Sequence, residues 1–205
     1  MSRFAGKPFI SLIIVFVLGT AIDQGTKQWA HHALLADSFH EFTDRYPTCG
    51  NATEELNRAR FVHQNATPIT VISNLFSFRY VENCSAAFNL MGNMPESLRF
   101  PFFLFISILA CVIIPYMYLK TPAEQKWMLW ALPFILTGAL GNLLDRMLFR
   151  YVIDFVDWYV VVGTKEYHWP TFNVADAAIV VGIGLMILQL LLAPKPAAAK
   201  PADHA

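Results

Sequence analysis

The sequence predicts an all-α membrane protein with four transmembrane helices. Its composition is the first reason: 56% of the 205 residues are hydrophobic and only 15% are charged, whereas soluble domains carry about 25% charged residues. The mean hydropathy is accordingly positive, at +0.43. The second reason is the distribution of the apolar residues, which form four uninterrupted blocks of spanning length instead of the spaced stripes of soluble amphipathic helices.

The four blocks contain no Asp, Glu, Lys or Arg and cover residues 8–22, 100–119, 127–144 and 177–194. A span takes about 20 helical residues, and the first block reaches that length by continuing past Asp23 towards Trp29. Backbone groups cannot stay unpaired in hydrocarbon, so each block must be helical. We expect spans at about 8–29, 98–119, 126–147 and 174–193, within one membrane domain of residues 1–193. The remaining residues, 194–205, are rich in Pro, Ala and Lys and are expected to form a disordered tail.

Basic residues beside the blocks predict the orientation. They precede the first block, lie between the second and third, and follow the fourth: Arg3, Lys7, Lys120, Lys126, Lys195 and Lys200. The positive-inside tendency places these segments, and therefore both termini, in the cytoplasm. A long loop at about 30–98 and a shorter one at about 147–171 then lie on the outer side.

The first block has an alternative interpretation as a cleavable signal peptide, because it combines Arg3 and Lys7 with a short apolar run and the small residues Gly19 and Ala21. Asp23, just beyond the run, favours a retained helix, because a charge at a helix end within a membrane is costly unless it is paired or used.

Cysteine usage leaves one question open. Cys49 and Cys84 both lie in the long outer loop, so a disulfide between them and two unpaired thiols are both compatible with the sequence. The scattered His and Cys residues show no metal-ligand spacing, and we expect neither a metal nor another cofactor. The formal net charge of +0 argues against a nucleic-acid partner.

Candidate chemistry rests on polar residues at the outer helix ends. Asp23 and Lys27 are four residues apart, so they share one helix face and can form an ion pair. A second polar stripe lies at the outer end of the third predicted span, with a glycine that permits close helix approach. Its members are Gly138, Asn142, Asp145 and Arg146. The structural alternative to a catalytic role is an ion pair that anchors the end of the first helix for Asp23 and Lys27. For the second group it is helix-to-helix contact, which is favoured for Asp145 and Arg146.

Two further carboxylates follow. Asp154 lies in an apolar and aromatic stretch just past the third block, where low dielectric favours the protonated acid. Asp176 lies at the start of the fourth block, three residues after Asn173, a good N-cap residue, so it can also stabilise that helix start. Two carboxylates brought together share one proton and can act as an acid/base pair on a peptide bond. Spacing alone does not identify which Asp residues pair.

Five motifs, in order along the chain, resemble the lipoprotein signal peptidases (signal peptidase II). They are DQGTK at 23–27, NCSAAF at 83–88, GNLLDR at 141–146, VIDF at 152–155 and FNVAD at 172–176. The resemblance implies an intramembrane aspartic endopeptidase of the bacterial inner membrane with its site on the periplasmic side. Such enzymes remove the signal peptide of a prolipoprotein immediately before its diacylglyceryl-modified cysteine.

The resemblance also implies roles for particular residues. Asp154 and Asp176 match the family's catalytic pair, whereas Asp145 does not. Positions that line or support the site and contact the substrate are matched by Asp23, Lys27, Asn83, Gly138, Asn142, Arg146 and Asn173. The implied partners are a diacylglyceryl-prolipoprotein, the lipid bilayer and a globomycin-type inhibitor, and a monomer is expected.

The sequence departs from the family pattern in two places. Ser85 stands where the family usually has Gly, which puts the path of the chain after Asn83 in question. The outer segment before Asn83 is also longer than usual, and its polar middle, 37–67, is expected to form an extra periplasmic loop. Beyond it, residues 69–81 are β-branched and aromatic, which predicts a small β-cradle on the membrane surface.

Other classes make different predictions. A serine peptidase would use Lys27 with Ser85, and a cysteine peptidase would use Cys84 with His63 or His168. For neither arrangement does the sequence indicate the third group that orients the base. A phosphotransferase acting through carboxylate-bound Mg2+ would lose turnover with a chelator. A transporter would need polar residues through the depth of the spans, which are largely apolar.

Overall fold

The computed structural model describes residues 9–35, 49, 52–84 and 95–192. Within these ranges the elements are α1 (Phe9–Leu34), α2 (Ala52–Asn65), β1 (Ile69–Ile72), β2 (Phe76–Asn83), α3 (Glu96–Lys120), α4 (Lys126–Phe149), β3 (Val152–Val162), β4 (Lys165–His168) and α5 (Val174–Leu192). Ser85, the tail 194–205 and the terminal basic residues Arg3, Lys7, Lys195 and Lys200 lie outside the described residues.

Three helices are long and apolar enough to cross a membrane: Ser97–Lys120 of α3, Lys126–Phe149 (α4) and Val174–Leu192 (α5). They coincide with three of the four predicted spans. The remaining predicted span falls within α1, which is 26 residues long but is not among the helices that meet this criterion of length and composition. Polar residues such as Asp23 and Lys27 occupy its second half.

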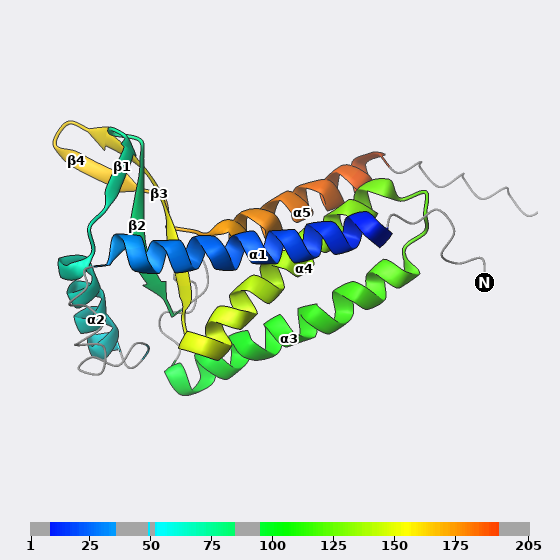
Figure 1. Cartoon of the computed structure of the whole chain (residues 1–205), viewed down its shortest axis with the longest axis horizontal. Coiled ribbons are helices and arrows are strands. Elements are labelled where there is room, and N and C mark those ends of the chain that lie inside the picture. Colours follow the sequence, from blue (N-terminus) through cyan, green and yellow to red (C-terminus); the bar gives the residue numbers. More distant parts are fainter. Residues whose placement is uncertain (1–8, 36–48, 50–51, 85–94, 193–205) are drawn as a thin grey trace, which may run out of the picture.

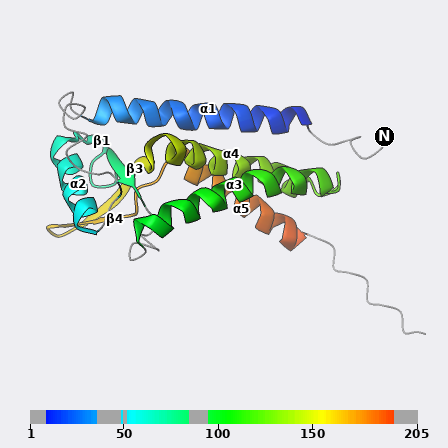
Figure 2. The same ribbon diagram turned by 90° about the horizontal axis from the view of Figure 1, so that it is seen from below.

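Long apolar side chains lie on the outer surface of the helices. Examples are Val17 of α1, Val112 of α3 and Val180 of α5, with 53%, 65% and 69% of their surface exposed. Large exposed apolar surfaces on several helices are typical of contact with lipid. By contrast, α4 contacts α1, α3 and α5 and is the central helix of the bundle (Figure 2).

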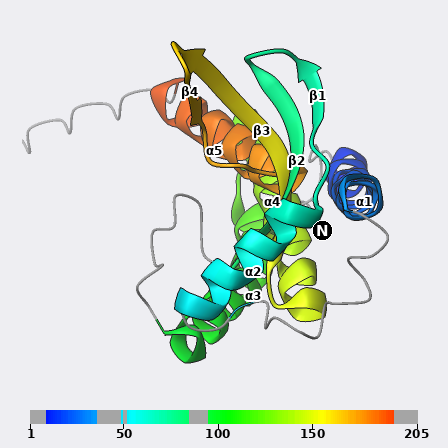
Figure 3. The same cartoon turned by 90° about the vertical axis from the view of Figure 1, so that its left-hand side faces the viewer.

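The sheet and α2 gather at one end of the helices (Figure 1). The beginning of α1, the end of α5 and the link between α3 and α4 all lie at the opposite end. Viewed from the sheet end, α2 crosses in front of the bundle beside β2 and β3 (Figure 3). This arrangement brings the ends of α1 and α4 and the start of α5 next to the sheet.

The four strands form an antiparallel sheet in the order β1-β2-β3-β4. The expected strands at 69–81 are present as β1 and most of β2. Two elements were not expected: residues 152–168 form the hairpin β3–β4, and α2 lies inside the segment expected to be loop. In the register of β2 on β3, Asn83 pairs with Val152 and Val81 pairs with Asp154. The candidate site residues Asn83 and Asp154 therefore lie on adjacent strands.

A buried apolar cluster joins the sheet to the helices. It contains Leu34 from α1, Val62 from α2, Tyr80 from β2, and Ile153 and Phe155 from β3. Each side chain is at most 5% exposed. Since side chains on a strand alternate in direction, Asp154 points to the other side from Ile153 and Phe155. The core packing of β3 therefore sets the direction of Asp154.

Candidate active site

Lys27 lies at the centre of a buried polar network and is 1% exposed. Its ammonium group forms ion pairs with Asp23 at 2.9 Å and with Asp145 at 3.0 Å, and it donates a hydrogen bond to Asn142 Oδ1 at 3.1 Å. An ammonium has three N–H donors, so these contacts use its full capacity. The predicted Asp23–Lys27 pair on one helix face is confirmed, and the contacts of Lys27 with Asp145 and Asn142 join α1 to α4.

The two carboxylates of this network also hold backbone groups of neighbouring elements. Asp145 Oδ2 accepts the N–H of Ile153 at 3.0 Å, and Asp23 Oδ1 accepts the N–H of Ala175 at 2.8 Å. Gln24 connects them by donating to Asp23 Oδ2 and Asp145 Oδ1. The network therefore fixes β3 and α5 against the helix ends, and the interpretation of Asp145 as a structural contact agrees with its partners.

Asp154 is held by two amide side chains. Asn83 donates to its Oδ2 at 2.8 Å, and Asn173 donates to its Oδ1 at 2.7 Å. Asp154 itself is only 1% exposed. Burial raises the pKa of Asp154 well above its ordinary value, and the nearby charge of Asp176 raises it further, although the hydrogen bonds from Asn83 and Asn173 oppose the shift.

Asp176 belongs to a reciprocal cap at the start of α5. Its backbone N–H donates to Asn173 Oδ1 at 2.9 Å, and its Oδ2 accepts the N–H of Asn173 at 3.2 Å. This is the predicted capping arrangement. Asp176 Oδ1 also accepts a hydrogen bond from Asn142 at 2.8 Å. Asn173 thus contacts both Asp154 and Asp176, and the two acids that the motifs single out lie on either side of one residue.

Gly138 and Arg146 complete the stripe on α4. A side chain at Gly138 would collide with the carbonyl oxygen of Ala175 and with Ile179, so glycine lets α5 lie directly against α4, as predicted. Arg146 donates to the carbonyl of Asn142 at 3.2 Å and lies over the ring of Phe103. Its guanidinium interacts electrostatically with Asp176, Asp154 and Asp145.

A cavity of about 760 Å³ opens beside this network. Its polar wall is formed by Asn83, Asn142, Arg146 and Asp176, and its apolar wall by residues that include Trp158, Trp169, Phe172, Ile179 and Val180. Asp154 does not line the cavity, but its partner Asn83 does. The cavity therefore offers a bound molecule one hydrogen-bonding wall and one apolar wall of the kind an acyl chain could contact.

The alternative nucleophiles are engaged elsewhere. Cys84 is bonded to Cys49 in a disulfide, which answers the open question of pairing and leaves Cys84 without a thiol. His168 contacts Asp157 at 2.9 Å and Glu166 at 3.2 Å. Lys27 is fully paired, as described above, and Ser85 lies outside the described residues.

Comparisons with known proteins point to one family. The family model described as signal peptidase (SPase) II matches residues 14–192. The chain is similar to the lipoprotein signal peptidase of Anaeromyxobacter sp. (strain Fw109-5), with 38% identity over 194 residues, 90% of this chain and 88% of that protein. It is also similar to the lipoprotein signal peptidase of Geobacter sulfurreducens, with 43% identity over 123 residues, 60% of this chain and 73% of that protein.

The fold resembles two solved structures of bacterial membrane enzymes. One, at 1.9 Å resolution, superimposes with a TM-score of 0.62 and 23% identity over 90% of this chain and 94% of the other. The second, at 2.3 Å resolution, gives a TM-score of 0.60 and 24% identity over 88% and 87% of the two chains. At this identity the likeness concerns the fold alone.

Proposed function

The chain belongs to the signal peptidase II family, and we propose that it removes signal peptides from diacylglyceryl-modified prolipoproteins immediately before the lipidated cysteine. It is on this basis an aspartic endopeptidase of a bacterial membrane. The observation that carries the proposal is the placement of Asp154 and Asp176 on either side of Asn173, with Asp176 on the wall of the cavity.

In the proposed mechanism the two aspartates act as one acid/base pair. Like charges at short range do not both ionise, so the pair holds one proton. The ionised carboxylate takes a proton from water while the protonated one gives its proton to the scissile carbonyl. Asn83 and Asn173 can hold Asp154 in place throughout, because their amide N–H groups donate to its carboxyl oxygens. These oxygens can accept a hydrogen bond in both the ionised and the protonated acid.

We propose that α1 is the fourth transmembrane helix. At 1.5 Å per residue, its 26 residues are long enough to cross about 30 Å of hydrocarbon. Its charges do not argue against this, because Asp23 and Lys27 are 0% and 1% exposed and face α4 rather than lipid. Apolar Ile13 and Ile22 on its outer surface are 57% and 56% exposed.

The orientation follows from the two ends of the bundle. Lys120 and Lys126 lie at the end away from the sheet, together with the start of α1 and the end of α5 (Figure 1). The positive-inside tendency makes that end cytoplasmic. The site, at the sheet end, is then periplasmic, at the outer face of the inner membrane.

A lipidated substrate would enter the cavity sideways from the bilayer. Its acyl chains would stay against the exposed surface of α5, where Val180 is 69% exposed, while the peptide bond meets Asp176. Each buried CH2 contributes about 0.8 kcal/mol to that attachment. A globomycin-type inhibitor would occupy the same cavity. We expect a single chain to suffice, because the groups of the network all come from one chain.

The test is to incubate the purified protein with one prolipoprotein before and after diacylglyceryl transfer. We expect cleavage of the lipidated form only, at the peptide bond immediately before the modified cysteine. Mass spectrometry would identify the product. A chelator and a thiol-alkylating reagent should leave the rate unchanged. Equal cleavage of both forms, or loss of turnover with the chelator, would contradict the proposal.

A further inference from the structure

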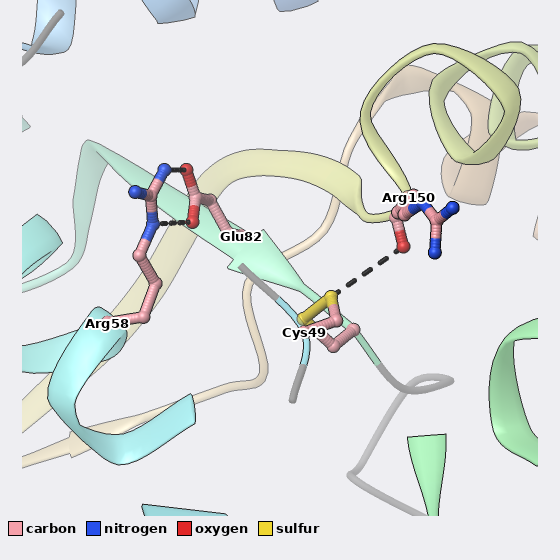
Figure 4. The surroundings of a disulfide bond; sticks show 5 residues. Cys49, Arg58, Glu82 and Arg150 are labelled. Carbon is pink, nitrogen blue, oxygen red and sulfur yellow. Dashed lines mark hydrogen bonds and ion pairs between the residues drawn. A yellow bond between two sulfur atoms is a disulfide. The ribbon is translucent and has the colours of Figure 1, made fainter. Parts of the chain in front are cut away.

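The segment between α1 and β1, which includes Cys49 and α2, is attached to the end of β2 at two points. Arg58 of α2 donates two hydrogen bonds to the carboxylate of Glu82, each 2.7 Å long. Cys49 forms the disulfide with Cys84, 35 residues further along the chain. Glu82 and Cys84 are the immediate neighbours of Asn83, which donates to Asp154. Figure 4 shows both attachments.

The Arg58–Glu82 pair is buried, with 4% and 3% of the two side chains exposed. Removing two charges from water is costly, so a buried pair adds little stability, but its two parallel hydrogen bonds fix one geometry. Burial alone lowers the pKa of Arg58, yet the hydrogen bonds and charge of Glu82 outweigh it and raise the pKa. Arg58 is therefore charged in the folded protein, and its two hydrogen bonds set the position of the Glu82 carboxylate.

The same segment also contacts the start of β3. The sulfur of Cys49 lies 3.6 Å from the carbonyl oxygen of Arg150, a residue with a left-handed backbone (φ 68°) that ends α4. Val152, two residues later, pairs with Asn83 across the sheet. The attachments thus hold the strand that carries Asn83 and the turn that leads to Asp154.

We propose that α2 and Cys49 form a brace for the active site. Arg58, Glu82 and the Cys49–Cys84 bond are positioning residues that keep the Asn83 amide directed at Asp154. The proposal rests on the proposed function, because it assigns the brace an effect on the same aspartate pair. None of the brace residues lines the cavity, so they act through Asn83 rather than by touching the substrate.

The first test compares kcat on a lipidated prolipoprotein for Arg58→Ala and for a control, Arg60→Ala, an exposed residue of the same helix. We expect Arg58→Ala to lower kcat by roughly ten- to a hundredfold, the cost of a small misplacement of a catalytic group, and Arg60→Ala to leave it unchanged. The double variant Arg58→Ala/Asn83→Ala should have a kcat less than about twofold below that of Asn83→Ala alone. If Arg58 acts through Asn83, its effect is lost once Asn83 is gone, so the two losses are not additive.

The disulfide provides an independent arm if Arg58→Ala does not fold. Replacing both Cys49 and Cys84 with Ala should lower kcat in the wild type and have little further effect in Asn83→Ala. The charge-exchanged variant Arg58→Glu/Glu82→Arg should recover kcat relative to Arg58→Ala, because it restores the ion pair. The double variants with Asn83→Ala separate this effect from general stability, because a stability loss would add to that of Asn83→Ala.

Three results would overturn the brace: equal kcat for Arg58→Ala and Arg60→Ala, losses that multiply in the Asn83→Ala background, or the disulfide variant at the wild-type rate. In each case the wild type would still cleave the lipidated precursor. Failure of the proposed function is recognised separately, because then neither the wild type nor Arg60→Ala cleaves it.

Discussion

Asp154 and Asp157 lie three residues apart on β3 and are both 1% exposed, yet they have opposite surroundings. Asp154 accepts hydrogen bonds from two neutral amides and is near the charge of the second carboxylate, Asp176, whereas the cations Lys27 and Arg146 interact with it electrostatically. Asp157 meets Arg79 at 3.2 Å and His168 at 2.9 Å, and it accepts a hydrogen bond from Ser77 at 3.1 Å. The direct partners of Asp154 are therefore neutral amides, whereas Asp157 is in direct contact with a cation.

The contrast shows that burial alone does not make a carboxylate an acid/base group. A nearby cation favours the ionised form, and a nearby carboxylate favours the protonated form. Asp157 is therefore suited to holding β2, β3 and β4 together. Asp154 is suited to exchanging a proton, and it lies on the side of the strand that faces α5.

The largest expected effect separates the two residues by activity. Asp154→Asn should lower kcat on a lipidated prolipoprotein by at least about a thousandfold, as should Asp176→Asn, because members of one catalytic unit each carry most of the effect. Asp157→Asn should keep kcat within about threefold of the wild type, because the partners of Asp157 are Arg79, His168 and Ser77 rather than the residues that hold the proposed catalytic pair. Circular dichroism would check that all three variants are folded.

A reversed result would break the distinction between the two aspartates. Turnover at the wild-type rate by Asp154→Asn, or a complete loss in folded Asp157→Asn, would contradict the assignment of the acid/base chemistry to Asp154.

The next effect concerns stability at the helix ends. Lys27→Met should lower the free energy of unfolding by about 3–5 kcal/mol, because it leaves Asp23 and Asp145 buried without their cation. Lys126→Met, at an exposed position on α4, is the matched control and should change it by less than about 0.5 kcal/mol. Reversible unfolding in mixed micelles measures both, and equal values would show that the network does not support the fold.

The smallest effect is a dependence of stability on pH. The folded pKa of Asp154 is raised above its ordinary value, which is about 3.9 in an unfolded chain. Its contribution to stability is therefore complete below that unfolded pKa and is lost as the pH rises through the folded pKa. Relative to Asp154→Asn, the wild type should become less stable as the pH rises through this window. A constant difference between them would contradict the raised pKa.

Much of the site could be predicted because its contacts are local in sequence or lie on regular helices. The Asp23–Lys27 ion pair follows from helical spacing, and the cap between Asn173 and Asp176 follows from a three-residue spacing. The proposed pairing of Asp154 with Asp176 could not be derived this way. It depends on how β3 and α5 meet, and only the resemblance to a family indicated it.

The parts that were not predicted depend on long-range contacts. The sequence predicts an apolar and aromatic stretch at the membrane interface for residues 151–157, but pairing with β2 makes residues 152–158 part of a strand. The segment around α2 is polar and was expected to be loop, whereas Arg58 and Val62 are buried against β2 and the apolar cluster. Neither the partner of Arg58 nor that of Cys49 can be read from spacing, since both lie more than 20 residues away in sequence.

The pairing of the two acids can be measured by 13C NMR titration of Asp side chains in the folded protein, with the Asp154 signal assigned through Asp154→Asn. We predict that the carboxyl of Asp154 titrates well above about 3.9 in the wild type and at a lower pH in Asp176→Asn, where the neighbouring charge is gone. An Asp154 signal that titrates at the ordinary value, or that does not move when Asp176 is replaced, would show that the two residues do not share a proton.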